Sequence, residues 1–357
     1  MKSNRIYLSP PTINSEEKEQ VLACLTSNWI SPVGPDITTF EKDVSKYLSI
    51  NSACALSSGT AALHLALRVL GIGRGDKVIC PTLTFAATSN VLLYENADPV
   101  FIDVDRKDWL IDIALVEKAF KDYKPKALIT VDLYGQSCNY QSILDLCKKY
   151  NVFLIEDAAE AFGSEYKGEK CASFGDIGIL SFNGNKIITT GGGGAVLTNN
   201  QKKYKYCNYL CDQAKDDTIF SIHNEIGFNY KLSNIQSALG CAQLDKLNNY
   251  LKKKKKIHEN YCKLFKDHPK FRILKPKNFF KSNYWLNVLI IKDIKKLKLK
   301  KIIKKLIKNG IETRPVWNLN HQQLPFRKFQ KYRIKNSTNI VKTHLCIPSS
   351  PNLTFGQ

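Results

Sequence analysis

Between residues 50 and 200, short apolar runs alternate with helical patterns, and this alternation restricts the fold more than any other feature of the chain. The expected strands are 53–56, 77–80, 99–104, 127–133, 152–156, 177–182 and 195–197, and the expected helices are 61–70, 86–94, 113–120 and 140–149. Strands that alternate with helices of this length form a largely parallel sheet covered on both faces. We therefore predict an α/β fold whose ligands bind at the carboxyl ends of the strands.

A second, smaller unit is expected after this sheet, since 357 residues are long for one compact domain. A helix predicted over 232–251 leads into a strand at 284–291, a helix at 295–309 and a strand at 311–315. We predict a large domain over 1–250 and a small α+β domain over 251–357.

The net charge of +21 suggests nucleic acid as a partner, but its distribution argues otherwise. Residues 251–310 hold 21 of the lysines and arginines and only three acids, mostly on two amphipathic helical patterns. A solvated lysine-rich helix face accounts for such a pattern, and attraction of an anionic substrate is a modest addition. The region lacks both interleaved stacking aromatics and a nucleic-acid-binding motif, so we expect no nucleic-acid partner.

Neither a membrane span nor a metal site is expected. No apolar run approaches the roughly 20 residues that a spanning helix needs, and the first residues do not resemble a signal peptide. The eleven cysteines are therefore expected to be reduced in a cytoplasmic protein. Cys207 and Cys211 are the closest pair and have no histidine at metal-binding spacing, so no zinc site is predicted.

The segment 181–194 places Lys186 in a short polar loop between an apolar strand and four consecutive glycines. Most other lysines lie on charged helical stretches, whereas Lys186 lies where the backbone is tightly folded and water is expected to be scarce. Desolvation favours the neutral amine, and a neutral amine can form a Schiff base. We predict that Lys186 binds a cofactor covalently.

Two further segments offer partners for such a cofactor. Residues 57–60 end a strand and open a helix, where Ser58, Gly59 and Thr60 form either an ordinary helix cap or a phosphate cradle. Asp157 ends an apolar strand and needs a cation, which a protonated pyridine nitrogen would provide. A structural carboxylate is the alternative interpretation of Asp157.

The remaining residues complete one ligand. Phe85 follows a strand and could lie against a planar ring, although core packing would also explain it. Ser181 offers a second hydroxyl for a phosphate, and Glu160 falls near the same cavity as Asp157. A phosphate cradle, a ring acid, a stacking aromatic residue and a desolvated lysine together indicate pyridoxal 5′-phosphate.

The order of these motifs closely resembles that of the DegT/DnrJ/EryC1/StrS sugar aminotransferases. The motifs are SGTAAL at 58–63, PTLTF at 81–85, FIDVD at 101–105, EDAAE at 156–160, SFNGNK at 181–186 and NYKLSN at 229–234. The resemblance implies the aspartate aminotransferase fold (fold type I) and a homodimer with active sites at the interface. It also implies transfer of an amino group, usually from L-glutamate, to a ketone on a nucleotide-linked sugar.

By motif position, the resemblance implies a role for each site residue. Lys186 would form the Schiff base and shuttle the proton, and Asp157 would pair with the pyridine nitrogen. Phe85 would stack on the ring, and Glu160 would lie near the phenolic oxygen. The resemblance implies that Gly59, Thr60 and Ser181, together with the neighbouring Ser58, contact the phosphate. It implies a further phosphate contact from Asn229 of the other subunit.

The substrate is implied by finer features. Asn183 occupies a position where many relatives have histidine. With asparagine here, the chain resembles the branch that acts on UDP-linked 4-keto-6-deoxy N-acetylhexosamines for surface glycans. Lys231 replaces a frequent arginine, and Arg314 and His321 match a segment that contributes to the substrate pocket, although Arg314 could equally be an ion-pair partner. Relatives continue past residues 346–350 into a terminal helix, so we expect part of the small domain's apolar face to be uncovered.

Two alternatives remain beside UDP-sugar amination: a GDP- or dTDP-linked keto sugar aminated at C4 or C3, and a non-catalytic homologue that senses a ligand or binds nucleic acid. A nucleotide-sugar 3-dehydratase is disfavoured, because that branch has histidine at the position of Lys186.

Overall fold

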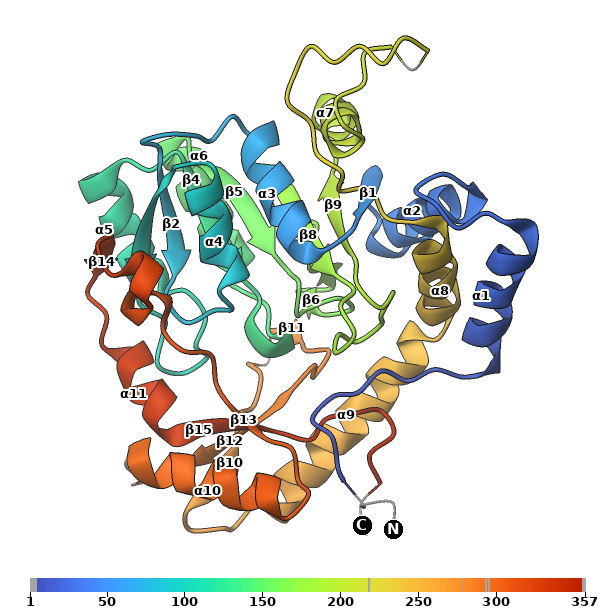
Figure 1. Cartoon of the computed structure of the whole chain (residues 1–357). Helices are drawn as coiled ribbons and strands as arrows, with labels where there is room; N and C mark the ends of the chain where they lie inside the picture. Colours follow the sequence, from blue (N-terminus) through green and yellow to red (C-terminus); the bar gives the residue numbers. More distant parts are fainter. Residues whose placement is uncertain (1–4, 218, 278, 293, 295, 355–357) are drawn as a thin grey trace.

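The computed structural model describes residues 5–217, 219–277, 279–292, 294 and 296–354, and an eight-stranded sheet lies at its centre (Figure 1). The strand order is β1-β9-β8-β5-β4-β2-β3-β14. The strands are β1 (Ser52–Leu56), β2 (Lys77–Pro81), β3 (Asp98–Ile102), β4 (Ala127–Val131), β5 (Phe153–Asp157), β8 (Ile177–Ser181), β9 (Gly194–Thr198) and β14 (Gln330–Tyr332). Within this sheet, β9 pairs antiparallel with both of its neighbours and the other pairings are parallel. The predicted α/β fold with a largely parallel sheet is confirmed.

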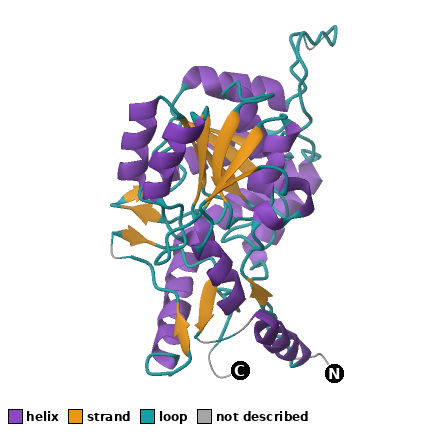
Figure 2. Cartoon of the chain, turned by 90° about the vertical axis from the view of Figure 1, so that its left-hand side faces the viewer, coloured by secondary structure: helices purple, strands orange, loops and turns teal. Residues whose placement is uncertain are grey.

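Helices cover both faces of this sheet, because successive side chains along each strand point to opposite faces. Val78 and Cys80 of β2 pack into one core with α3 (Gly59–Val69), α4 (Ala87–Tyr94) and α7 (Gln201–Cys211). Ile79 packs into the opposite core with α5 (Ile113–Tyr123) and α6 (Tyr140–Tyr150). Figure 2 shows the strands between these helical layers. The N-terminal helices α1 (Ser15–Ser27) and α2 (Pro35–Leu48) contact α8 (Asn234–Asp245).

The helix predicted over 232–251 is interrupted in the structure. It consists of α8, which begins with a capping box of Ser233 and Gln236, and of α9 (Leu247–Leu264). Between them, the N–H of Lys246 donates to the carbonyl of Gln243, three residues back, instead of four. This tightened turn changes the direction of the chain, and hydrophobic periodicity alone does not reveal it.

A second, four-stranded antiparallel sheet follows, in the order β10-β12-β15-β13. Its strands are β10 (Phe271–Ile273), β12 (Asn287–Ile291), β13 (Arg314–Pro315) and β15 (His344–Ile347), and the helices beside it are α9, α10 (Lys296–Lys308) and α11 (Asn336–Thr343). The strand predicted at 284–291 is therefore shorter, and of 311–315 only the last two residues are a strand. The domain boundary at residue 250 stays a prediction.

Several segments connect the two sheets. A small sheet joins β11 (Phe280–Lys281) to β6 (Glu165–Tyr166) and β7 (Glu169–Lys170), and the chain returns to the large sheet at β14. Near the N-terminus, Ile6 bridges to Ile311 beside β13. Short 3-10 turns lie at Leu133–Gly135, Asn320–Gln322 and Leu324–Phe326.

An arm formed by residues 213–231, without 218, projects from the large unit after α7 (Figures 1 and 2). Four large apolar side chains on this arm are exposed to solvent, at 82% for Ile219, 76% for Phe220, 47% for Ile222 and 77% for Ile226. Across the described residues, no helix combines the length and the apolar character that a membrane crossing requires.

Candidate active site

A cavity of about 270 Å³ opens where α3 begins and where β4, β5 and β8 end. Nine of the predicted site residues line it together: Ser58, Gly59, Thr60, Phe85, Asp157, Glu160, Ser181, Asn183 and Lys186. The structure thus brings together side chains that lie up to 128 residues apart in sequence, from Ser58 to Lys186. They meet at the carboxyl edge of the parallel strands, where ligands of such sheets bind.

The end of the cavity next to α3 has the shape of a phosphate cradle. Ser58 caps the helix by accepting a hydrogen bond from the N–H of Ala61 at 3.0 Å, and the first N–H groups of α3 point outward without partners inside the helix. A Cβ atom on Gly59 would lie 2.9 Å from Cβ of Ser181, and one on Gly194 would lie 2.5 Å from N of Gly59. Glycine is therefore required for this close approach. The cradle fits a phosphate at the positive end of the α3 dipole.

Asp157 lies at the end of β5 with only 5% of its surface exposed. Its Oδ2 accepts a hydrogen bond from Thr88 Oγ1 at 2.8 Å, and its Oδ1 accepts one from the N–H of Ala159 at 3.2 Å. Burial raises the pKa of Asp157, whereas these two hydrogen bonds and the charge of Lys186 lower it. No lysine, arginine or histidine of the described residues forms an ion pair with it. A protonated pyridine nitrogen would fit this unpaired carboxylate.

Lys186 lines the same cavity as this carboxylate. Its Nζ is 4.1 Å from the centroid of the Trp285 ring, and burial lowers its pKa, while the charges of Glu160 and Asp157 raise it. Burial also raises the pKa of Glu160 to about 7, and its two oxygens accept hydrogen bonds from the N–H of Tyr134 at 2.7 Å and from Trp317 Nε1 at 3.2 Å. The lowered pKa increases the neutral, nucleophilic fraction of the Lys186 amine.

Phe85 lies at the mouth of the cavity and is 52% exposed, so core packing does not explain it. Its ring centroid is 5.1 Å from that of Trp317, with the two planes tilted by 59°. Two aromatic faces at the mouth provide a contact surface for a planar ring.

Four predicted residues lie outside the cavity lining. Asn229 is exposed on the arm, and Lys231 lies beside β1, where it forms a bridge with Leu56. Arg314 forms an ion pair with Glu312 at 2.6 Å and lines a neighbouring cavity of about 440 Å³. His321 Nδ1 is 2.6 Å from Thr82 Oγ1.

The lining residues that were not singled out from the sequence include Thr88, Trp285 and Trp317. Thr88 lies in the first turn of α4, three residues after Phe85, and its closeness in sequence to a predicted site residue was the available signal. Trp285 precedes an apolar strand, where an aromatic residue is normally part of the core, so no signal marked it. The two tryptophans also line the neighbouring cavity, which therefore adjoins the first.

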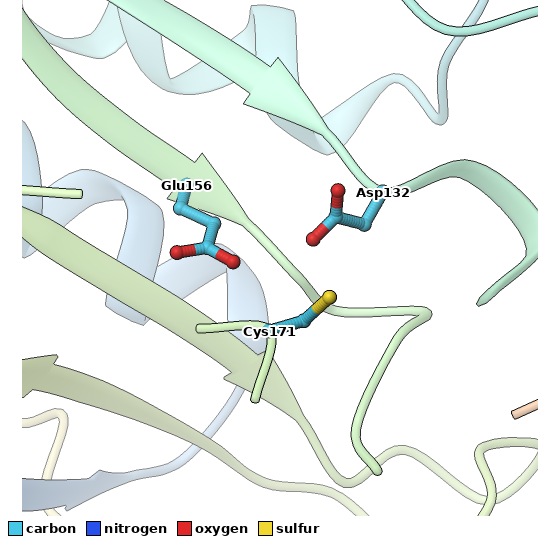
Figure 3. Close-up of side chains that lie close together, drawn as sticks. All are labelled: Asp132, Glu156 and Cys171. Carbon is cyan, nitrogen blue, oxygen red and sulfur yellow. The ribbon is translucent and has the colours of Figure 1, made fainter. Parts of the chain in front are cut away.

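Behind the cavity, Asp132, Glu156 and Cys171 meet at the ends of β4 and β5 (Figure 3). Their oxygen and sulfur atoms lie within 4.8 Å of one another, a grouping of metal-ligand type that spacing did not predict. Glu156 accepts hydrogen bonds from the N–H groups of Ala172, Phe174 and Gly175. In contrast, Oδ2 of Asp132 is buried and has no hydrogen-bond partner among the described residues. A proton held between the two carboxyl groups would satisfy this oxygen.

Replacing Asp132 with asparagine is expected to change the pH dependence of stability. Burial raises the pKa of Asp132 to about 6 from an ordinary 3.8, so the folded protein binds this proton more tightly than the unfolded chain. Its stabilising effect is complete below about pH 4 and is lost as the pH rises through 6. The wild type should therefore lose stability relative to Asp132→Asn as the pH rises from 4 to 7, measured by urea unfolding. A constant difference between the two proteins over this range would contradict the assignment.

The fold and the site together define a class of enzyme. The cavity combines a buried lysine, a buried acid and a phosphate cradle at the edge of an α/β sheet of this topology. This combination defines a pyridoxal 5′-phosphate-dependent aminotransferase of fold type I. The family of this chain follows from comparison with known sequences. The sequence model of the DegT/DnrJ/EryC1/StrS aminotransferase family matches residues 11–357, and the chain belongs to this family.

Individual relatives agree with this membership. The chain is 37% identical to GDP-perosamine synthase of Escherichia coli O157:H7, over 97% of this chain and 94% of the relative. It is 35% identical to UDP-4-amino-4,6-dideoxy-N-acetyl-beta-L-altrosamine transaminase of Campylobacter jejuni strain 81-176, over 88% and 85% of the two chains. The PLP form of Spr1654 from Streptococcus pneumoniae, assigned as a sugar aminotransferase, superposes with a TM-score of 0.92 at 26% identity, over 98% of this chain and 95% of that one. The predicted fold type, cofactor and aminotransferase class are confirmed.

Proposed function

We propose that this sugar aminotransferase moves the amino group of L-glutamate onto a UDP-linked 4-keto-6-deoxy N-acetylhexose that is used for a surface glycan. The observation that carries the transfer chemistry is the amine of Lys186, held with a lowered pKa in the same cavity as the buried carboxylate of Asp157. The UDP assignment is supported by the resemblance at Asn183, which lines the same cavity.

We also propose the individual roles. Ser58, Gly59, Thr60 and Ser181 hold the cofactor phosphate, and Phe85 covers one face of its ring. When bound, pyridoxal 5′-phosphate withdraws electrons from the carbon that carries the amino group. Asp157 remains ionised beside a ring N–H and keeps that nitrogen protonated, which is the favourable arrangement for a buried carboxylate.

Lys186 is proposed to move the proton. Its neutral amine accepts a proton from the carbon of glutamate and returns one to the sugar carbon, which requires a group whose pKa lies near the working pH. Glu160, with a pKa of about 7, lies near enough to influence the charge on this amine. The aromatic ring of Trp285, whose centroid is 4.1 Å from Nζ, excludes water from one side of the amine.

The nucleotide portion of the substrate is proposed to occupy the neighbouring cavity. It is lined by Tyr7, Arg314 and Trp317, among others, and it shares Asn185, Trp285 and Trp317 with the cofactor cavity. An arginine beside aromatic rings suits a diphosphate joined to a base. Arg314 would have to exchange its ion pair with Glu312 for this contact.

A homodimer is part of the proposal. The arm carries four exposed apolar side chains, and a second set lies on and after α1: Leu22, Leu25, Trp29, Ile30 and Val33. Exposed apolar surface of this extent marks interaction sites. Asn229 lies on the arm and not in the cavity of its own subunit, which fits the implied contact with the phosphate of the other subunit.

A panel of nucleotide sugars tests the substrate. We expect protein loaded with pyridoxal 5′-phosphate and supplied with glutamate to aminate a UDP-4-keto-6-deoxy N-acetylhexosamine, detected by the mass and NMR spectrum of the product. Turnover of the GDP- or dTDP-linked sugars alone would overturn the UDP assignment, and the 37% identity to GDP-perosamine synthase makes a GDP-linked keto sugar the main competitor. Light scattering of the same preparation gives the subunit number, and an active monomer would overturn the dimer.

A further inference from the structure

Lys254 is a buried lysine that the proposed chemistry does not use. It lies on α9, is 1% exposed, and forms no ion pair with any carboxylate of the described residues. Burial of an ammonium group without a counter-charge is costly, and here burial lowers the pKa of Lys254 to about 7. An apolar residue would fill the same space without this cost, so the amine needs an explanation.

The contacts of Lys254 lead to the active site. Its Nζ donates hydrogen bonds to two backbone carbonyls, that of Trp285 at 3.1 Å and that of Ser349 at 2.6 Å. One amine thereby connects α9, the segment before β12 and the segment after β15. Ser349 in turn donates its N–H to the carbonyl of Leu8, which belongs to the wall of the neighbouring cavity.

Trp285 continues this connection to the catalytic lysine. Its Nε1 donates to the carbonyl of Asn185 at 2.7 Å, and the face of its ring lies 4.1 Å from Nζ of Lys186. Its own N–H is held by Asn283 Oδ1 at 2.8 Å, so the backbone of Trp285 is fixed on the N–H side by Asn283 and on the carbonyl side by Lys254. A single residue therefore separates the two buried amines.

We propose that Lys254 is a positioning residue that holds Trp285, and through its ring the amine of Lys186, in the geometry required for transamination. The proposal rests on the proposed role of Lys186. The ring has two opposing effects on the amine: its face attracts the charged form, and its bulk excludes water. Because burial is the largest influence on the pKa of Lys186, the exclusion of water by the ring outweighs the attraction of its face for the charged amine. A displaced ring should therefore make Lys186 more basic.

The test is the pH dependence of cofactor uptake by cofactor-free protein, followed by the absorbance of the lysine-bound cofactor. Uptake of the cofactor requires the neutral amine of Lys186, so the pH midpoint of uptake reports the basicity of this amine. The acidic groups that act on this basicity are Glu160 and Asp157. We expect Lys254→Met to shift this midpoint upward by about one pH unit, in line with partial loss of desolvation. Lys253→Met, the exposed neighbour on the same helix, is the matched control and should leave it unchanged.

A double-mutant cycle separates positioning from direct repulsion between the two amines. If Lys254 acts through the ring, Trp285→Phe and Lys254→Met should shift the midpoint by less together than the sum of their separate shifts. Additive shifts, or a wild-type midpoint in a folded Lys254→Met protein, would overturn the proposal. Should Lys254→Met fail to fold, a wild-type midpoint in Trp285→Phe would overturn it. If wild-type protein itself forms no lysine-bound cofactor, the proposed role of Lys186 fails instead.

Discussion

Replacing Lys186 with alanine is expected to abolish transamination and to yield protein that no longer retains the yellow colour of bound cofactor. The variant loses the residue proposed both as the nucleophile and as the group that moves the proton, so the loss of rate should exceed about 10⁴-fold. Borohydride treatment of the wild type should attach the cofactor to the peptide that contains Lys186, as read by mass spectrometry.

Two controls sharpen this result. Lys186→Arg keeps a long cation beside Trp285 but supplies no neutral amine, so it should be as inactive as the alanine variant. Lys202→Ala removes an exposed lysine of α7 and should leave both colour and rate unchanged. A Lys186→Ala protein that transaminates at the wild-type rate would refute the assignment of the catalytic lysine.

Replacing Asp157 with asparagine should separate cofactor binding from catalysis. The phosphate cradle at Gly59 and Thr60 is untouched, so the variant should still bind the cofactor, as measured by retained absorbance after gel filtration. Without the carboxylate the ring nitrogen is not kept protonated, and turnover should fall by about 100- to 1000-fold, the typical loss when one preorganised electrostatic partner is removed.

Thr88→Val provides the matched control for this change. It removes only the hydrogen bond to Oδ2 of Asp157 and keeps the charge, so its turnover should fall far less than that of Asp157→Asn. Equal losses in the two variants would mean that orientation of the carboxylate, and not its charge, is what matters. Undiminished turnover in Asp157→Asn would remove the electron-withdrawing argument altogether.

Much of the large sheet and of the cavity could be predicted from the sequence because both depend on local patterns. Apolar runs of strand length define β1 to β5, β8 and β9, and Ser58 marks the beginning of α3 by ordinary capping chemistry. The glycines near residue 194 indicated a close approach of the backbone, and Gly194 indeed packs against Gly59.

The features that sequence could not reveal depend on contacts between distant residues. Lys254 meets the carbonyls of Trp285 and Ser349, which lie 31 and 95 residues away. Helical spacing from Tyr250 and Ile257 places it on the buried face of α9, but this spacing does not reveal which groups it contacts there. The meeting of Asp132, Glu156 and Cys171 likewise results from strand order and a returning loop. The turn at Lys246 was missed because apolar spacing continues across it.

The route of the chain between its two sheets has a consequence for any attempt to divide the protein. The segment at Ile6 pairs beside β13, and β14 completes the edge of the large sheet before β15 enters the small one. A fragment ending at residue 250 would therefore lack β14, and the remaining fragment would lack the partner of Ile311. The first piece would be missing a strand of its own sheet, whereas the second would keep all four strands of the small sheet and lose only pairings made outside it. Segments from both ends of the chain contribute to each unit, so recombining parts of this enzyme with those of a relative would require exchange of both ends together.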